Sequence, residues 1–125
     1  MNTTDLNDPA AIVQRQLDAY NARDLVALRA IYADQVQVFE HPSTLIATSA
    51  DQLCGNLALR FQEPNLHAEL LTRIVCDKLV IDHERVTRTF PEGTGHLEMV
   101  AMYEVDQGRI VRAWFKFGPR QLDVV

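Results

Sequence analysis

The chain has 125 residues, of which 47% are hydrophobic and 23% are charged, and these values are typical of one globular domain. Its formal net charge of −5 excludes the strongly basic balance of a nucleic-acid-binding protein. The start MNTTDLND has no secretory signal and no apolar run is long enough to span a bilayer, so we expect a cytoplasmic protein without a membrane partner.

The first half of the chain is dominated by helical patterns. Asp8 is a suitable N-cap, Pro9 suits the first helical position, and apolar residues follow at helical spacing as far as Tyr20. Ser49 and Gln52 have the spacing of a capping box. We therefore expect one domain over residues 1–125, with 1–7 disordered, helices over 9–20, 24–34 and 49–61, a strand over 35–41 and a loop over 43–48.

The second half of the chain has the pattern of a β-meander. Asp77-Lys78 and Asp106-Gln107-Gly108 are short enough for hairpin turns, and the glycine tolerates a positive φ. We expect strands over residues 66–76, 79–90, 96–105 and 109–117. Helices followed by a meander predict an α+β domain, with the helices on one face of a mainly antiparallel sheet.

The last predicted strand carries large apolar side chains on both faces, which is unusual for a sheet whose second face meets water. Simple alternation places Val111, Ala113, Phe115 and Phe117 on one face and Ile110 and Trp114 on the other. We therefore expect a homodimer through the outer face of the sheet, with Arg112, Trp114 and Lys116 at the interface. The alternative is that a few apolar side chains are tolerated in solvent.

Three segments of the chain carry a resemblance to a known family: AAIVQRQLDAYNARDL, ADQVQVFEHP and GRIVRAWFKFGP. In this order they resemble the nuclear transport factor 2-like superfamily, which contains the ketosteroid isomerases and the SnoaL-like polyketide cyclases. The resemblance covers residues 9–120. It implies a cystatin-like cone, in which three N-terminal helices pack on a curved sheet that encloses an apolar pocket.

The resemblance also implies where chemistry would take place. In ketosteroid isomerase an aspartate moves the proton, while a tyrosine and a protonated aspartic acid hold the oxyanion. The position of the base, just before a proline at the end of the first strand, falls on His41, with Glu40 beside it. The tyrosine position falls on Gln16 and the acid position on Ala101. The resemblance thus implies a retained base without the oxyanion tyrosine and aspartic acid.

The strand end Glu40-His41-Pro42 is the first candidate site. Neighbouring residues of a strand face opposite ways, so only one of Glu40 and His41 points inward. If Phe39 faces inward, His41 lies in the pocket, where it can act as a general base near neutral pH. Glu40 is the alternate base, and a solvent-exposed strand-end histidine is the alternative without function.

The cluster Asp82-His83-Glu84 is the second candidate site. Alternation places His83 and Arg85 on one face of the strand and Asp82 and Glu84 on the other. The resemblance places the first pair in the pocket, where His83 would assist His41 and Arg85 would bind a carboxylate or enolate. The alternative is a satisfied core histidine beside a solvated or dimer-facing acidic pair.

Polar and apolar residues on other elements complete the expected pocket. Tyr20 lies one turn after Gln16, and Tyr103 shares a strand face with Ala101, so both hydroxyls can donate to a substrate oxygen. The expected substrate-binding set is Gln16, Tyr20, Phe39, Arg85, Met99, Tyr103 and Phe117. The histidine spacing matches no metal motif and the two cysteines form no CxxC pair, so we expect neither a metal nor a cofactor.

Two functions remain open from the sequence. The first is a cofactor-independent isomerase or cyclase that binds a small apolar, carbonyl-bearing molecule, with His41, Glu40 and His83 as candidate catalytic residues. The second is a non-catalytic ligand-binding or dimeric accessory domain. A polar, convergent pocket favours the first function, whereas a pocket filled by apolar side chains favours the second; the candidates for filling it are Phe39, Met99, Met102 and Phe117.

Overall fold

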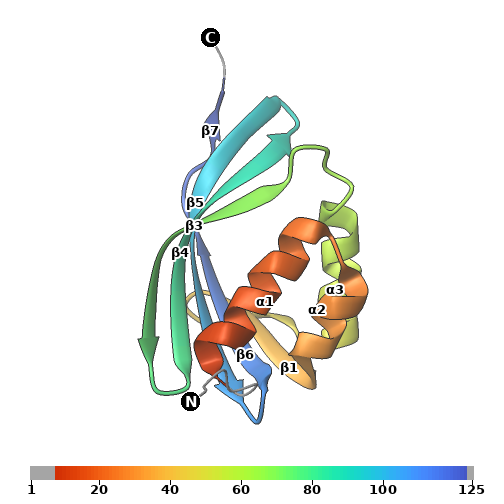
Figure 1. The fold of residues 1–125 in the computed structure, drawn as a ribbon. Coiled ribbons are helices and arrows are strands. Elements are labelled where there is room, and N and C mark those ends of the chain that lie inside the picture. Colours follow the sequence, from red (N-terminus) through yellow and green to blue (C-terminus); the bar gives the residue numbers. More distant parts are fainter. Residues whose placement is uncertain (1–7, 124–125) are drawn as a thin grey trace.

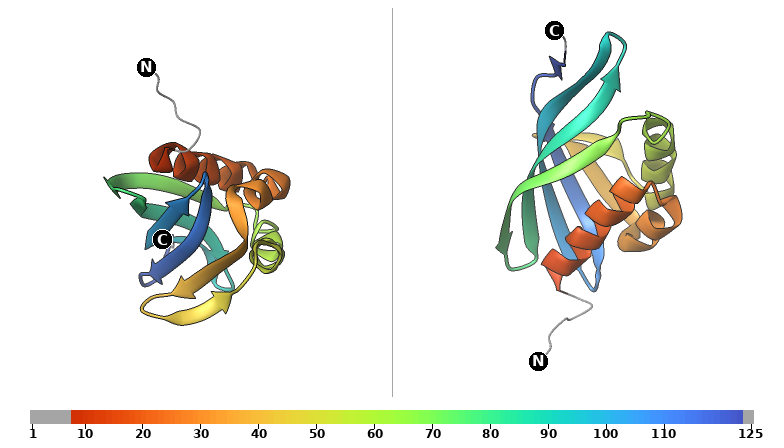
Figure 2. Two further views of the ribbon diagram at one scale, coloured as in Figure 1. Left: turned by 90° about the horizontal axis from the view of Figure 1, so that it is seen from below. Right: turned by 45° about the horizontal axis from the view of Figure 1, so that its top comes forward.

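The computed structural model describes residues 8–123, so the expectation of disorder over residues 1–7 lies outside the described residues. A curved sheet forms one layer, and three helices pack on one of its faces (Figure 1). Two further views show how the sheet curls toward the helices (Figure 2). The α+β class and the cystatin-like arrangement predicted from the sequence are confirmed.

The three helices are α1 (Pro9–Ala22), α2 (Leu25–Ile31) and α3 (Ala50–Arg60). The Asp24 side chain caps α2 by accepting a hydrogen bond from the Ala27 backbone N–H at 3.0 Å, and Ser49 caps α3 in the same way. The second helix is shorter than the predicted range 24–34 because Tyr32 already has an extended backbone. None of the helices within residues 8–123 has the length and hydrophobicity needed to cross a membrane.

The strands are β1 (Tyr32–Glu40), β2 (Thr44–Ala47), β3 (His67–Cys76), β4 (Leu79–Phe90), β5 (Gly93–Asp106), β6 (Arg109–Phe117) and β7 (Gln121–Leu122). They are ordered β2-β1-β6-β5-β4-β3, with β7 beside β5. Only β1 and β6 pair in parallel among the described strands. The sequence missed β2, which was expected to be a loop, and the short β7, and it started β5 three residues late.

A β-bulge changes the phase of alternation in β6. Val105 pairs with Ile110 while Glu104 pairs with Arg112, so Val111 is the extra residue between the two pairs. Ile110 is therefore fully buried, and its predicted place on the outer face with Trp114 was wrong. A prediction from simple alternation assigns residues to the wrong face when a bulge inserts an extra residue into the strand.

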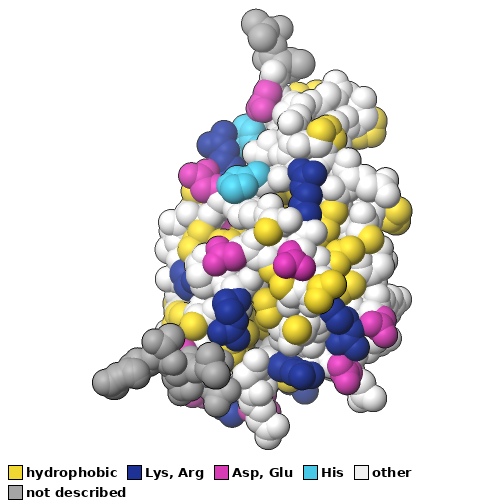
Figure 3. Space-filling model, turned by 45° about the vertical axis from the view of Figure 1, so that its right-hand side comes forward, with side chains coloured by type: hydrophobic (Ala, Val, Ile, Leu, Met, Phe, Trp, Pro, Cys, Tyr) yellow, Lys and Arg dark blue, Asp and Glu magenta, His cyan; other side chains and the backbone are white. Residues whose placement is uncertain are grey.

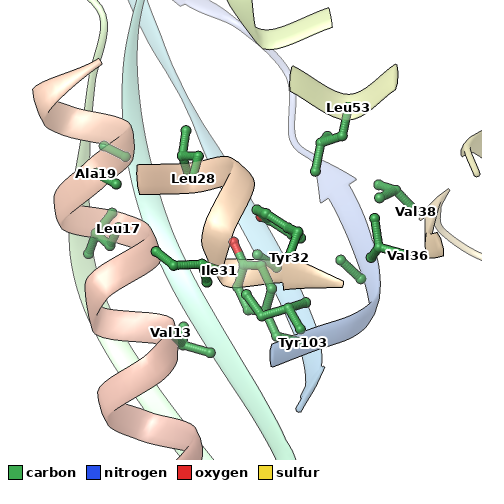
Figure 4. Close-up of a cluster of buried hydrophobic side chains, with 14 of the residues drawn as sticks. Val13, Leu17, Ala19, Leu28, Ile31, Tyr32, Val36, Val38, Leu53 and Tyr103 are labelled. Atoms are coloured by element: carbon green, nitrogen blue, oxygen red, sulfur yellow. The ribbon is translucent and has the colours of Figure 1, made fainter. Parts of the chain in front are cut away.

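The core lies between the helices and the inner face of the sheet. Val13 and Leu17 of α1 belong to the same buried cluster as Leu28 of α2 (Figure 4). Tyr32 of β1 and Tyr103 of β5 lie side by side at the centre of this cluster, and each is only 1% exposed. Two phenols at the centre of an apolar core bring polar groups to the place where the pocket forms.

The outer face of the sheet carries an apolar row that crosses five strands. The cross-strand neighbours Ile74, Ile81, Met102, Trp114 and Phe39 follow one another from β3 to β1. The rings of Phe39 and Trp114 stack with their centroids 5.7 Å apart. This face therefore has a continuous apolar row as well as the expected polar side chains.

Candidate active site

A cavity of about 360 Å³ lies between the helices and the inner face of the sheet. Its size and largely apolar wall are typical of small-molecule sites. Residues of helices α1 and α3 and of strands β1, β2, β4, β5 and β6 form the wall. Its apolar side chains include Leu17, Leu53, Leu57, Met99, Phe115 and Phe117.

Glu84 is the most unusual side chain of the cavity wall. It projects from the inner face of β4 and is only 2% exposed. Its Oε2 atom is buried without a hydrogen-bond partner among residues 8–123. Burial, followed by the charge of Asp82, raises the pKa of Glu84 to about 7, while Arg73 acts in the opposite direction. Near neutral pH this carboxyl can therefore be either protonated or ionised.

Asp82 lies two residues before Glu84 on the same face of β4 and is fully buried. Arg73 of β3 donates to both of its oxygens, with Nε to Oδ1 at 2.7 Å and Nη2 to Oδ2 at 2.9 Å. The remaining Arg73 nitrogen, Nη1, donates to Gln14 at 2.9 Å. The bidentate pair compensates the charge of Asp82, whereas Glu84 has no ion-pair partner within the described part of the chain. One carboxyl is thus structural and the other is available to a ligand.

Three tyrosines line the pocket together with Glu84: Tyr20, Tyr32 and Tyr103. Burial is the largest cause that raises the pKa of each of these hydroxyls, and the charge of Glu84 contributes to all three shifts. A hydrogen bond with Gln16 acts in the opposite direction on the pKa of Tyr32. The three phenols therefore keep their protons near neutral pH and can act as hydrogen-bond donors.

Gln16 of α1 reaches the same pocket and is 5% exposed. Its Oε1 atom, like Oε2 of Glu84, has no hydrogen-bond partner within residues 8–123. Buried polar atoms are almost always paired, so unpaired ones call for a functional explanation. Two such atoms, one on α1 and one on β4, line the same cavity and indicate where polar ligand groups would be held.

The strand-end candidates are oriented opposite to the prediction. Val36 and Val38 are fully buried and set the inward phase of β1, so Glu40 lines the pocket. His41 lies outside the pocket lining and is exposed, and Phe39 faces outward. The expectation that Phe39 and His41 point inward was therefore wrong, although the two valines already indicated the correct phase.

The candidates on β4 are also reversed. His83 lies on the outer face, where its side chain is 42% exposed and Nε2 is 2.6 Å from a Glu98 oxygen. Arg85 is exposed on the same face and lies outside the pocket lining. The expected pocket positions of His83 and Arg85 were wrong because buried Val80 and Val86 share their phase with Asp82 and Glu84 rather than with the histidine.

The remaining predicted pocket residues lie where the sequence placed them. Gln16, Tyr20, Met99, Tyr103 and Phe117 all line the cavity, and their binding of a substrate stays a prediction. Sequence reasoning missed Tyr32, Arg60 and the inward direction of Glu84. Position 101, where the resemblance implied a missing acid, is a buried alanine directly opposite Asp82 in the pairing of β4 with β5.

Comparisons with known proteins agree with this architecture. The family model of the SnoaL-like domain matches residues 13–113. No match was found among curated proteins. An uncharacterised cystatin-fold protein from Novosphingobium aromaticivorans is 21% identical and superimposes with a TM-score of 0.80, covering 86% of this chain and 97% of the other.

Two structures with functional descriptions also share the fold. IdmH of Streptomyces antibioticus, a proposed polyketide cyclase, is 19% identical with a TM-score of 0.76, covering 88% of this chain and 91% of that one. An LEH-like epoxide hydrolase of M. tuberculosis is 15% identical with a TM-score of 0.76, covering 87% and 81%. At these identities the likeness shows the fold alone, whereas the family model shows that this chain belongs to the SnoaL-like domain family.

Proposed function

We propose that the protein is a cofactor-independent isomerase or cyclase that acts on a small apolar carbonyl compound, with Glu84 as the group that moves the proton. The observation that carries this proposal is the uncompensated Glu84 carboxyl on the pocket wall, with its pKa raised to about 7. A general base or acid works best when its pKa lies near the operating pH. Strongly shifted carboxyls in apolar pockets are typical of catalytic sites.

The proposed reaction begins when ionised Glu84 removes a proton from the carbon next to the substrate carbonyl. The electron pair of the broken C–H bond forms the enolate double bond, and negative charge develops on the oxygen. Hydrogen bonds from Tyr32 and Tyr103 would stabilise that charge, and Gln16 would hold a second polar group of the substrate. Donors fixed in this way contribute roughly 3–4 kcal/mol each to the transition state.

The protonated Glu84 then returns its proton. In an isomerisation the proton goes to a different carbon of the enolate, and the double bond moves. In a cyclisation the enolate carbon attacks a second carbonyl of the same molecule, a carbon–carbon bond forms, and the new alkoxide takes the proton. Both sequences balance without an electron donor or acceptor, and both use the two protonation states of one carboxyl.

The open volume of the pocket supports a catalytic function rather than a purely structural role. Met99 and Phe117 line the cavity without filling it, and Phe39 and Met102 belong to the outer face. The charge of Glu84 acts on the hydroxyls of Tyr20, Tyr32 and Tyr103, so this carboxyl shares the pocket with neutral hydrogen-bond donors. The similarity in fold to a proposed cyclase and to an epoxide hydrolase is consistent with small-molecule chemistry in such a pocket.

Turnover of β,γ-unsaturated ketones and of poly-β-ketone substrates tests this proposal. We expect Glu84→Gln to lower kcat by about 10²–10⁴-fold, the usual contribution of a positioned acid or base. Glu98→Gln is the matched control, because Glu98 is an exposed glutamate on the outer face. Circular dichroism verifies that both variants fold.

Unchanged turnover in folded Glu84→Gln would remove Glu84 from the mechanism. If the native protein binds these ketones in a thermal-shift assay but turns over none of them, the non-catalytic ligand-binding function is correct instead.

We also propose that the protein is a homodimer through the apolar row on the outer face. Trp114 lies in this row, and the predicted interface residues Arg112 and Lys116 flank it on β6. Arg112 is held by Glu104 through hydrogen bonds of 2.8 and 2.9 Å. Sedimentation analysis should give a dimer mass for the native chain and a monomer mass for Trp114→Glu, and a native monomer would contradict this proposal.

A further inference from the structure

The two ends of the pocket differ in charge. Glu84 and Arg88 both face inward from β4 and both line the cavity, four residues apart. At about 3.3 Å per strand residue their Cα atoms are roughly 13 Å apart. Arg60, in the last turn of α3, lines the same cavity. The Glu63 backbone N–H donates to the Arg60 carbonyl oxygen at 3.0 Å, and the Glu63 carboxylate accepts from Arg88, so Arg60 lies at the Arg88 end.

The two arginines at this end differ in how their charges are compensated. Arg88 donates to both oxygens of Glu63, at 2.8 and 2.7 Å, and the Thr89 backbone N–H adds a third hydrogen bond of 3.0 Å. Arg60 has no carboxylate within ion-pair distance among residues 8–123, and its charge acts on the Tyr20 hydroxyl, lowering the pKa of that group. Arg60 is therefore the arginine at this end whose charge no carboxylate within ion-pair distance compensates.

The space between the two ends is apolar. Leu57, Val86, Leu97 and Met99 line it. A ligand that fills the pocket therefore meets a carboxyl group at one end, hydrocarbon along its body and an uncompensated guanidinium at the other end. On the molecular surface viewed from the helix side, acidic and basic side chains are scattered among apolar ones (Figure 3), so the charge difference is a property of the pocket rather than of that face.

We infer that the pocket selects amphipathic monocarboxylates, with Arg60 binding the carboxylate and the reacting carbon placed at Glu84. The position of the reacting carbon rests on the proposed function, whereas carboxylate recognition by Arg60 does not require turnover. A guanidinium matches the planar, two-oxygen geometry of a carboxylate. Glu63 already holds Arg88, so only the Arg60 guanidinium is left to balance the charge of a ligand, and a monoanion suits this site better than a phosphate.

Calorimetric binding of octanoate and octanamide tests the inference. The two probes have the same chain and differ in the charge of the end group. We expect octanoate to bind the native protein about tenfold more tightly than octanamide, because one charge-assisted hydrogen bond contributes an affinity difference of about this size. Arg60→Gln should remove this preference and leave octanamide binding unchanged. Arg15→Gln, which removes an exposed arginine outside this pocket, should retain the preference.

Equal binding of the two probes to the native protein would overturn the inference, as would a preference that survives Arg60→Gln. Absence of binding by both probes would overturn it as well. Neither probe has an acidic proton next to a ketone, so the outcome is independent of the turnover measured with Glu84→Gln. Loss of activity in that variant together with equal probe binding would leave the catalytic proposal standing and remove only the carboxylate specificity.

Discussion

The two faces of β4 place ionisable side chains of one strand in contrasting environments. On the inner face Glu84 is almost fully buried without an ion-pair partner, and its pKa rises to about 7. On the outer face His83 is substantially exposed and is paired with Glu98. A histidine has its ordinary pKa near 6.5 without any tuning. Burial can therefore bring the pKa of a glutamate into the range of a histidine, so residue type alone does not identify the base.

We expect the largest loss of stability when the ion pair on the inner face of the sheet is removed. Arg73→Met leaves the buried Asp82 carboxylate without its cation, and we expect a loss of about 3–5 kcal/mol in the free energy of unfolding. Urea denaturation at neutral pH measures this loss. Arg112→Met on the outer face, which removes the exposed pair with Glu104, should lower stability by no more than about 1 kcal/mol. Equal losses in the two variants would contradict the contrast between the faces.

The next effect is a pH dependence of stability that comes from Glu84. Its pKa rises from 4.5 to about 7 on folding, so the folded state binds this proton more tightly than the unfolded state. The resulting stabilisation is complete below pH ~4.5 and is lost as the pH rises through ~7, a change of about 3 kcal/mol. Glu84→Gln lacks this titration.

We therefore expect the native protein to lose about 3 kcal/mol relative to Glu84→Gln between pH ~4.5 and ~8. Urea denaturation of both proteins at a series of pH values measures the difference, and carboxyls that do not interact with Glu84 contribute equally to both proteins. Parallel stability curves would show that Glu84 titrates normally in the folded state.

The smallest effect is expected on the outer face. His83→Gln removes an exposed histidine whose partner Glu98 is also exposed, so we expect a change in stability within about 0.5 kcal/mol. The pH dependence of kcat/KM should also stay unchanged, because His83 lies away from the pocket. Loss of activity in His83→Gln with retained activity in Glu84→Gln would reverse the roles of the two faces.

The sequence predicted the fold because its signals are local and repeated. Pro9, Asp24 and Ser49 mark where the helices begin. The order of helices and strands indicated an α+β domain, and the resemblance of three segments to a known family implied the cystatin-like cone. The resemblance placed Gln16 in the pocket, and strand alternation from Ala101 placed Tyr103 there. These predictions depend on motif positions and spacing along the chain, which the sequence displays directly.

The prediction of the site failed where the sequence did not show which face of a strand points inward. In β4 ionisable residues alternate on both faces, and only the buried valines Val80 and Val86 distinguish the inner one. In β6 the bulge at Val111 changes the phase within the strand. The compensation of Asp82 by Arg73 depends on pairing between strands, which no single strand reveals. Whether an acid is buried, and whether it has an ion-pair partner, therefore decides if it is available for chemistry; its residue type does not.

The most direct measurement is a carbon-13 NMR titration of the Glu84 side-chain carboxyl, with Glu84→Gln used to assign its resonance. We predict a midpoint near pH 7 in the native protein, set mainly by burial in the pocket. A midpoint near the ordinary value of 4.5 would mean that the carboxyl is fully ionised at neutral pH, and it would contradict Glu84 as the group that both takes and returns the proton.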